Sequence, residues 1–180
     1  HSYIGGPSYY CEPKTEVDET LEQLWKNLPN MIPENNSVLC VQDGSGSMST
    51  LIGQNSSVTA LDVSRALAIY TAEKLQGEFH NTIIAFGSNP NYINISDSMT
   101  LRDKIATVAQ NNDCGSTNIM AVFERILDTA VDNSLTQEQL PKNILIISDM
   151  EFDQGCYFAD MSDTFDDRHN ITLKLQLDQD

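Results

Sequence analysis

A five-residue segment places one carboxylate and two hydroxyl groups at alternate positions, Asp43-Gly44-Ser45-Gly46-Ser47. The two glycines between them allow the backbone to turn tightly. Small hard cations prefer oxygen ligands, and proteins bind Mg²⁺ through one or two carboxylates while several positions stay with water. The pattern therefore predicts a loop that binds a divalent cation through the side chains of Asp43, Ser45 and Ser47.

Two further segments carry oxygen-bearing side chains beside predicted secondary structure. Asp149 follows the apolar run 143–147, and Thr117 precedes a predicted helix at 119–132. Strands of a parallel sheet joined by helices end at one edge, and ligands bind at that edge. The side chains predicted to converge there on one metal ion are Asp43, Ser45, Ser47, Thr117 and Asp149.

A metal ion would explain why two acids are brought together. Without a cation, two neighbouring carboxylates repel each other and the pKa of one rises. The set has few acids and several hydroxyls, so we expect Mg²⁺, with Mn²⁺ or Ca²⁺ as alternatives. Each segment alone has an ordinary structural interpretation, because Asp-Gly-Ser forms many turns and Gly-Ser-Thr begins many helices. The combination of the three favours a metal site.

Several side chains near these loops in the sequence have roles that stay open. Glu151, Asp153 and Asp113 are interpreted either as an outer shell that orients metal-bound water or as exposed acids on loops. Met48 and Met150 are expected to pack beneath the loops.

The predicted loops require a sheet whose strands end together. The apolar run that begins at Val38 predicts the first strand, with Cys40 as a buried thiol inside it. The other predicted strands are 81–86, 92–95, 143–147 and 172–177. The predicted helices are 15–28, which packs on the core through Trp25, 59–76, 99–110 and 119–132, with a short turn at 136–140. The alternation predicts an α/β fold, a Rossmann-like doubly wound and mainly parallel sheet with helices on both faces.

Composition limits the classes of function. The chain has 180 residues and a net charge of −16, which repels phosphate backbones, so we expect no direct nucleic-acid binding by this fragment. No apolar run approaches the roughly 18 residues of a membrane span, so we expect no membrane association. The four cysteines lack metal-site spacing, which indicates a reducing, cytoplasmic location. We expect an N-terminal arm at 1–14 and a single domain at 15–180.

Together the motifs resemble the von Willebrand factor A-like domain and its metal-ion-dependent adhesion site. The pattern of that site is Asp-x-Ser-x-Ser, a distant Thr, and a later Asp that follows a strand. In this sequence those positions are Asp43, Ser45, Ser47, Thr117 and Asp149. The resemblance implies that both serines contact the metal directly, and that Thr117 and Asp149 do so directly or through water.

The form of the first motif is closer to the intracellular branch of that family, with the Ro ribonucleoprotein and chelatase-associated proteins, than to integrin-type domains. The segments 148–154 and 86–90 are similar to those of a poorly characterised group that carries this domain near the C-terminus of a longer protein. The resemblance covers about residues 20–160. It implies a further apolar strand and a closing helix that the final residues do not supply, so we expect a domain cut short at its C-terminus.

The resemblance implies a protein-binding module and not an enzyme, with the Asp or Glu of a partner completing the Mg²⁺ coordination. A subunit of an RNA–protein complex, by analogy with the Ro protein, is an alternative. A metal-dependent phosphohydrolase is another, because a strand-end Asp, a Thr and a later Asp also occur in phosphoryl-transfer sites. Against it, residue 45 is Ser where a dehalogenase-type phosphatase has a second Asp, and no Ser-His-Asp or Cys-His set is evident.

Overall fold

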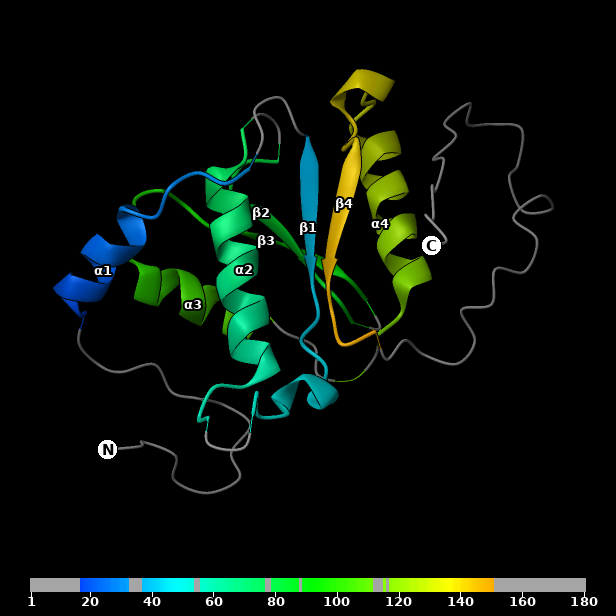
Figure 1. Ribbon diagram of the computed structural model, residues 1–180. Helices are drawn as coiled ribbons and strands as arrows, with labels where there is room; N and C mark the ends of the chain where they lie inside the picture. The colour runs from blue at the N-terminus through cyan, green and yellow to red at the C-terminus, as the bar shows by residue number, and fades with distance from the viewer. Residues whose placement is uncertain are drawn as a thin grey trace.

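The computed structural model describes residues 17–32, 37–53, 56–76, 79–87, 89–111, 115 and 117–150. In this part of the chain, four strands form one sheet in the order β3-β2-β1-β4 (Figure 1). The strands are β1 Val38–Gln42, β2 Thr82–Ala85, β3 Asn91–Asn94 and β4 Asn143–Ile147. β1 pairs in parallel with β2 and β4, and β3 pairs antiparallel with β2. The protein therefore has an α/β fold with a mixed, mostly parallel sheet.

The register brings the ends of the parallel strands level. Gln42, at the end of β1, lies opposite Ala85 of β2 and Ile147 of β4. The backbone bonds continue one residue further, since the amide of Asp43 donates to the carbonyl of Ile147 at 3.0 Å. The edge at which β1, β2 and β4 end is called the carboxyl edge below.

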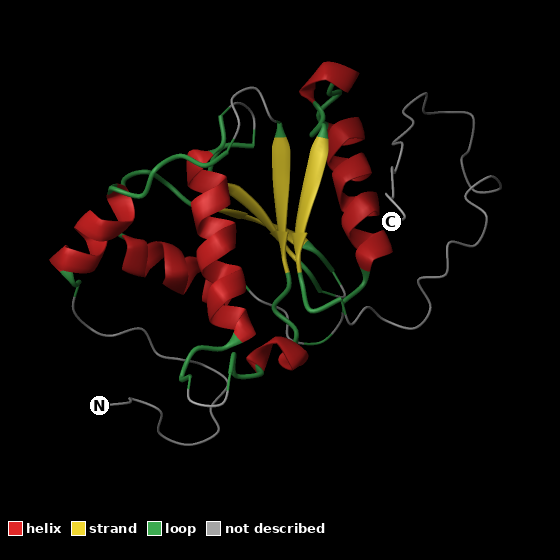
Figure 2. Ribbon diagram, viewed as in Figure 1, coloured by secondary structure: helices red, strands yellow, loops and turns green. Residues whose placement is uncertain are grey.

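Helices cover both faces of the sheet (Figure 2). The helices in the described ranges are α1 Glu19–Lys26, α2 Ala60–Lys74, α3 Leu101–Gln110 and α4 Ile119–Asp132, with short 3₁₀ turns η1 Gly46–Ser49 and η2 Gln137–Gln139. Residues of α2 and α3 pack against Cys40 on one face, and residues of α4 pack against Leu39 and Val41 on the other. β1 is therefore buried on both sides, which explains its uninterrupted apolar run.

The predicted elements in the described ranges are present, with small shifts at their ends. The first helix begins at Glu19 and not at residue 15, because the side chain of Asp18 caps it by accepting the amides of Thr20 and Leu21. Cys40 is fully buried, as expected, and burial raises the pKa of its thiol to about 12. The predicted arm at 1–14 and the predicted strand at 172–177 lie outside the described residues.

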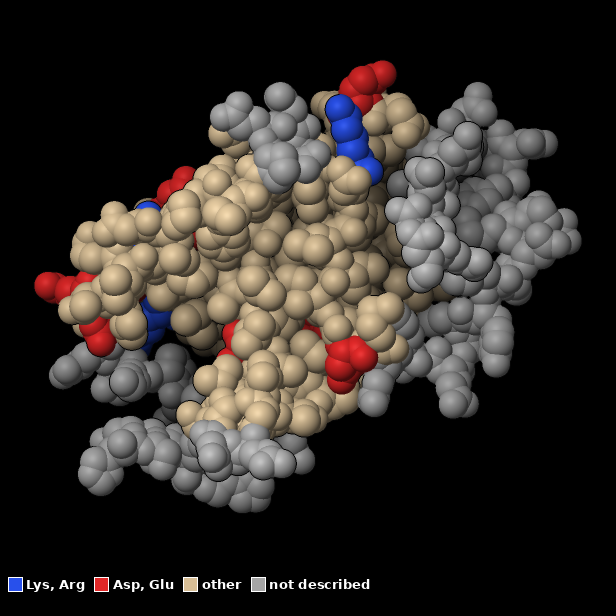
Figure 3. All heavy atoms as spheres, viewed as in Figure 1, with Lys and Arg blue, Asp and Glu red and all other residues tan. Residues whose placement is uncertain are grey.

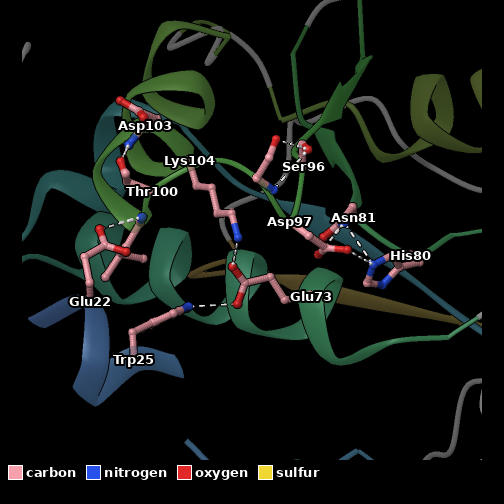
Figure 4. A network of polar contacts seen from close by, with 12 residues as sticks. Glu22, Trp25, Glu73, His80, Asn81, Ser96, Asp97, Thr100, Asp103 and Lys104 are labelled. Atoms are coloured by element: carbon pink, nitrogen blue, oxygen red, sulfur yellow. Dashed lines mark hydrogen bonds and ion pairs between the residues drawn. The ribbon is translucent and has the colours of Figure 1, made fainter. Parts of the chain in front are cut away.

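A network of polar side chains fixes α1 to α2 and α3 (Figure 4). The indole N–H of Trp25 donates to Glu73 Oε2 at 2.8 Å, and the Trp25 ring meets Tyr70 edge-on at 6.4 Å. Lys104 of α3 forms an ion pair with Glu73, and both side chains are largely buried. The prediction that α1 packs through Trp25 is confirmed, whereas its neighbour Leu24 is 61% exposed.

None of the helices in the described ranges is long and apolar enough to cross a membrane.

The Glu73–Lys104 pair gives a test of how α1 and α3 are held. Lys104→Met is expected to lower the free energy of unfolding by about 3 kcal/mol, because it leaves the Glu73 carboxylate buried without a cation. Adding Glu73→Gln should recover most of the loss, since the uncharged amide oxygen still accepts from Trp25. Urea unfolding of both variants measures the effect, and equal stability of the single variant and the wild type would contradict it.

Candidate metal centre

Asp43 is a fully buried carboxylate at the end of β1. Its Oδ1 accepts the backbone N–H of Ser45 at 2.8 Å, and its Oδ2 accepts the hydroxyl of Ser148 at 2.5 Å. Burying a carboxylate is unfavourable unless it is hydrogen-bonded or paired with a cation. Asp43 is thus held by a donor from its own loop and by one from the loop that follows β4.

The hydroxyls of Ser45 and Ser47 lie side by side, with their oxygens 2.9 Å apart. Ser45 precedes η1 in an extended conformation, and the 3₁₀ turn brings Ser47 back towards it. An octahedral Mg²⁺ with oxygens at roughly 2.1 Å separates adjacent ligands by about 3.0 Å, whereas the longer distances around Ca²⁺ of roughly 2.4 Å spread them further. The two hydroxyls therefore stand at a spacing suited to adjacent ligands of the smaller ion.

Thr117 and Asp149 come from the other two predicted segments. Thr117 is buried and immediately precedes Asn118, whose side chain caps α4 by accepting the amide of Ala121 at 3.1 Å. Figure 1 shows that α4 begins at the lower side of the view, where β1 and β4 end and where η1 lies. Asp149 is exposed and follows Ser148, which contacts Asp43 directly. The loops that follow β1 and β4 thus meet at the carboxyl edge, and α4, which Thr117 precedes, begins at the same edge (Figure 1).

The methionine predictions have different outcomes. Met48 is buried, with 3% of its surface exposed, which agrees with the expected packing. The prediction for Met150 is wrong, because its side chain is 68% exposed. Its backbone is left-handed, with φ of 66°. The three flanking acids, Asp113, Glu151 and Asp153, lie outside the described residues.

The chemistry of the described side chains restricts the kind of metal that they suit. The described residues contain no group of three or more His, Cys, Asp and Glu side chains that could together hold a metal ion. A site with nitrogen and sulfur ligands, of the kind that zinc prefers, is therefore not supported there. The proposed set consists of two carboxylates and three hydroxyls, and these oxygen ligands match a hard cation.

Comparison with known proteins places these loops in a family. Residues 37–174 match a family described as a domain of unknown function, DUF7788. The chain belongs to the DUF7788 family. The chain is similar to the uncharacterized protein L728 of Acanthamoeba polyphaga mimivirus. The two are 28% identical over 155 residues, which are 84% of this chain. The aligned region is only 25% of that relative. No solved structure matches the chain.

The matched region of the DUF7788 domain begins just before β1 and includes all five predicted ligands. α1 lies outside it.

Ser148 is the residue at this site that the sequence prediction missed. Its hydroxyl contacts the carboxylate of Asp43, although the two residues are 105 positions apart in the chain. The register of β1 with β4 is the feature that reveals this contact. Because Gln42 lies opposite Ile147, the next residues, Asp43 and Ser148, must also lie opposite each other.

Gly46 and Gly53 permit a matched test of the backbone conformation in this part of the chain. Gly46 does not have a positive φ and a Cβ there would meet no atom within 4 Å, so Gly46→Ala should raise the free energy of unfolding by about 0.4–1 kcal/mol. Gly53 is equally unobstructed but has φ of +88°, so Gly53→Ala should lower it by about 1 kcal/mol. Urea unfolding of the two variants decides, and a large loss of stability in Gly46→Ala would contradict the assigned backbone.

Proposed function

We propose that this DUF7788 domain is a protein-binding module that holds Mg²⁺ at its carboxyl edge and receives an Asp or Glu of a partner on the ion. We further propose that its fold is the doubly wound fold of the von Willebrand factor A-like domain. The observation that carries the proposal is the pair of hydroxyls of Ser45 and Ser47, 2.9 Å apart beside the buried carboxylate of Asp43. Strand order and helices on both faces support it.

Each side chain has a distinct part in this proposal. Ser45 and Ser47 would contact the ion directly, while Thr117 and Asp149 would contact it directly or through water. Asp43 would supply charge from below the loop. The ion, when bound, would supply a Lewis-acidic position for the carboxylate of the partner. The hydrogen bond between the two serine hydroxyls holds them 2.9 Å apart, close to the spacing that adjacent ligands of Mg²⁺ would have.

The local charge explains why a cation is needed to bind an acidic partner. The segments 43–59 and 148–150 contain Asp43 and Asp149 but neither Lys nor Arg. Figure 3 shows acidic atoms and no basic ones near the end of β4 on the face in view. One divalent cation would neutralise these two carboxylates. It would also attract an acidic partner, which the chain itself repels because its net charge is −16.

Exposed apolar side chains that are close in the sequence to the proposed ligands favour a protein as the partner. Leu51, Ile52 and Val58 are 55%, 48% and 44% exposed, and Met150 is also exposed. The backbone N–H of Ile52 donates to the carbonyl of Val58 at 2.8 Å, which holds these two residues together. Apolar groups gathered near a polar centre are typical of protein interaction surfaces.

A phosphohydrolase is less well supported than a binding module. His80 and Lys142 precede β2 and β4 respectively, so both lie at the opposite end of the sheet from the proposed ion. They are therefore too remote to act as a general base or to bind a transferred phosphate there. No observation on the described residues favours the RNA–protein alternative.

Calorimetric titration with Mg²⁺ tests the proposed site. We expect the wild type to bind the ion, Asp43→Ala to bind at least tenfold more weakly, and Ser45→Ala and Ser47→Ala to lose affinity as well, because each removes a ligand or a neutralising charge. Ser49→Ala is the matched control in the same 3₁₀ turn and should bind normally. Unchanged affinity in Asp43→Ala would show that the ligand assignment is wrong.

Incubation with a generic phosphate ester and Mg²⁺ separates the binding module from the enzyme. We expect no metal-dependent hydrolysis above the rate without protein, since His80 and Lys142 lie at the opposite end of the sheet from the proposed ion. The measurement is release of coloured product over time. Metal-dependent turnover that disappears in Asp149→Asn would overturn the binding proposal in favour of phosphoryl transfer.

A further inference from the structure

A single hydroxyl connects the two acidic loops of the proposed metal centre. Ser148 Oγ donates to Asp43 Oδ2 at 2.5 Å and accepts the backbone N–H of Met150 at 3.0 Å. The first bond fixes one proposed carboxylate. The second bond stabilises the turn that carries the other proposed carboxylate, that of Asp149.

We propose that Ser148 is a positioning residue that sets the orientation of both carboxylates before the ion binds. The proposal rests on the proposed function, since the ion in question is the Mg²⁺ proposed there. Ser148 itself need not touch the ion. Its effect is exerted through Asp43 and through the backbone around Asp149.

The hydrogen bonds of Asp43 explain the first half of the proposal. Ser45 N–H holds Oδ1 and Ser148 holds Oδ2, so the carboxylate is fixed from both sides. Each carboxylate oxygen has a second lone pair, which stays available to a cation or to a metal-bound water. Without Ser148, the carboxylate would lose one of its two constraints and would have to be ordered when the ion binds.

The backbone of Met150 explains the second half. A φ of 66° is uncommon for a residue other than glycine and is unfavourable unless its surroundings support it. The bond from Met150 N–H to the Ser148 hydroxyl supplies such support. A hydroxyl is required for both contacts, because it donates and accepts at once. Threonine keeps this chemistry and alanine does not.

Loss of the hydroxyl should leave the strands paired. The N–H of Asp43 donates to the carbonyl of Ile147, and this backbone bond does not involve the Ser148 side chain. The Ser148→Ala variant is therefore expected to fold, which allows its effect on the ion to be measured separately from its effect on stability.

Mg²⁺ calorimetry on Ser148→Ala, Ser148→Thr and the control Ser49→Ala tests the proposal, with urea unfolding of each metal-free variant alongside. We expect Ser148→Ala to bind Mg²⁺ about 10–100-fold more weakly, as is typical when a group that orients a ligand is removed. Ser148→Thr should restore affinity to within a few-fold of the wild type. Ser49→Ala should not differ from it.

A second substitution tests the backbone half of the proposal. Adding Met150→Gly to Ser148→Ala should recover part of the lost affinity, because glycine adopts a positive φ without support. A purely structural role of Ser148 would instead lower stability without this selective recovery of affinity.

The outcomes separate this proposal from the proposed function. If the wild type binds Mg²⁺, Asp43→Ala does not, and Ser148→Ala binds as tightly as the wild type, the role of Ser148 is refuted while the metal site stands. If the wild type and Asp43→Ala bind alike or not at all, both proposals fail.

Discussion

The parallel pairing of β1 with β4 is the constraint on which the candidate site depends. Their register ends with Gln42 opposite Ile147, and the next residue of each strand contacts the other through the Ser148–Asp43 hydrogen bond. A shift of one residue would turn alternate side chains to the other face of the sheet. The two acidic loops would then no longer be held together, whatever their own sequences.

The burial of β1 gives Asp43 its unusual environment. Leu39, Cys40 and Val41 are fully buried between the helices of the two faces, so the strand delivers its carboxylate below the surface of the carboxyl edge. Gln42 is also fully buried, and its side-chain amide donates to the carbonyl of Asp43 at 2.5 Å. The packing that stabilises the sheet therefore also orders the first loop of the site.

The sequence was sufficient for the elements and insufficient for the contacts between them. Apolar runs and helical periodicity depend on which face of a segment is buried, and this could be recognised from residues such as Leu39 and Val41. The role of Ser148 depends on strand register, and Met150 is exposed and has a positive φ that its residue type does not predict. Gly46 lies in a 3₁₀ turn that does not require glycine, and its residue type did not predict this conformation either.

The donors around Asp43 leave lone pairs for the divalent cation that we propose at this site. Ser45 N–H and Ser148 Oγ already satisfy one lone pair on each carboxylate oxygen, so further binding must use the remaining ones. A lysine ammonium could donate to the carboxylates and to the hydroxyls, but it would not impose a spacing on two oxygens held 2.9 Å apart. A small cation uses both, because oxygens of either kind can bind it and because its coordination geometry sets their spacing. The hydroxyl pair, more than the acidic charge, therefore favours the metal interpretation.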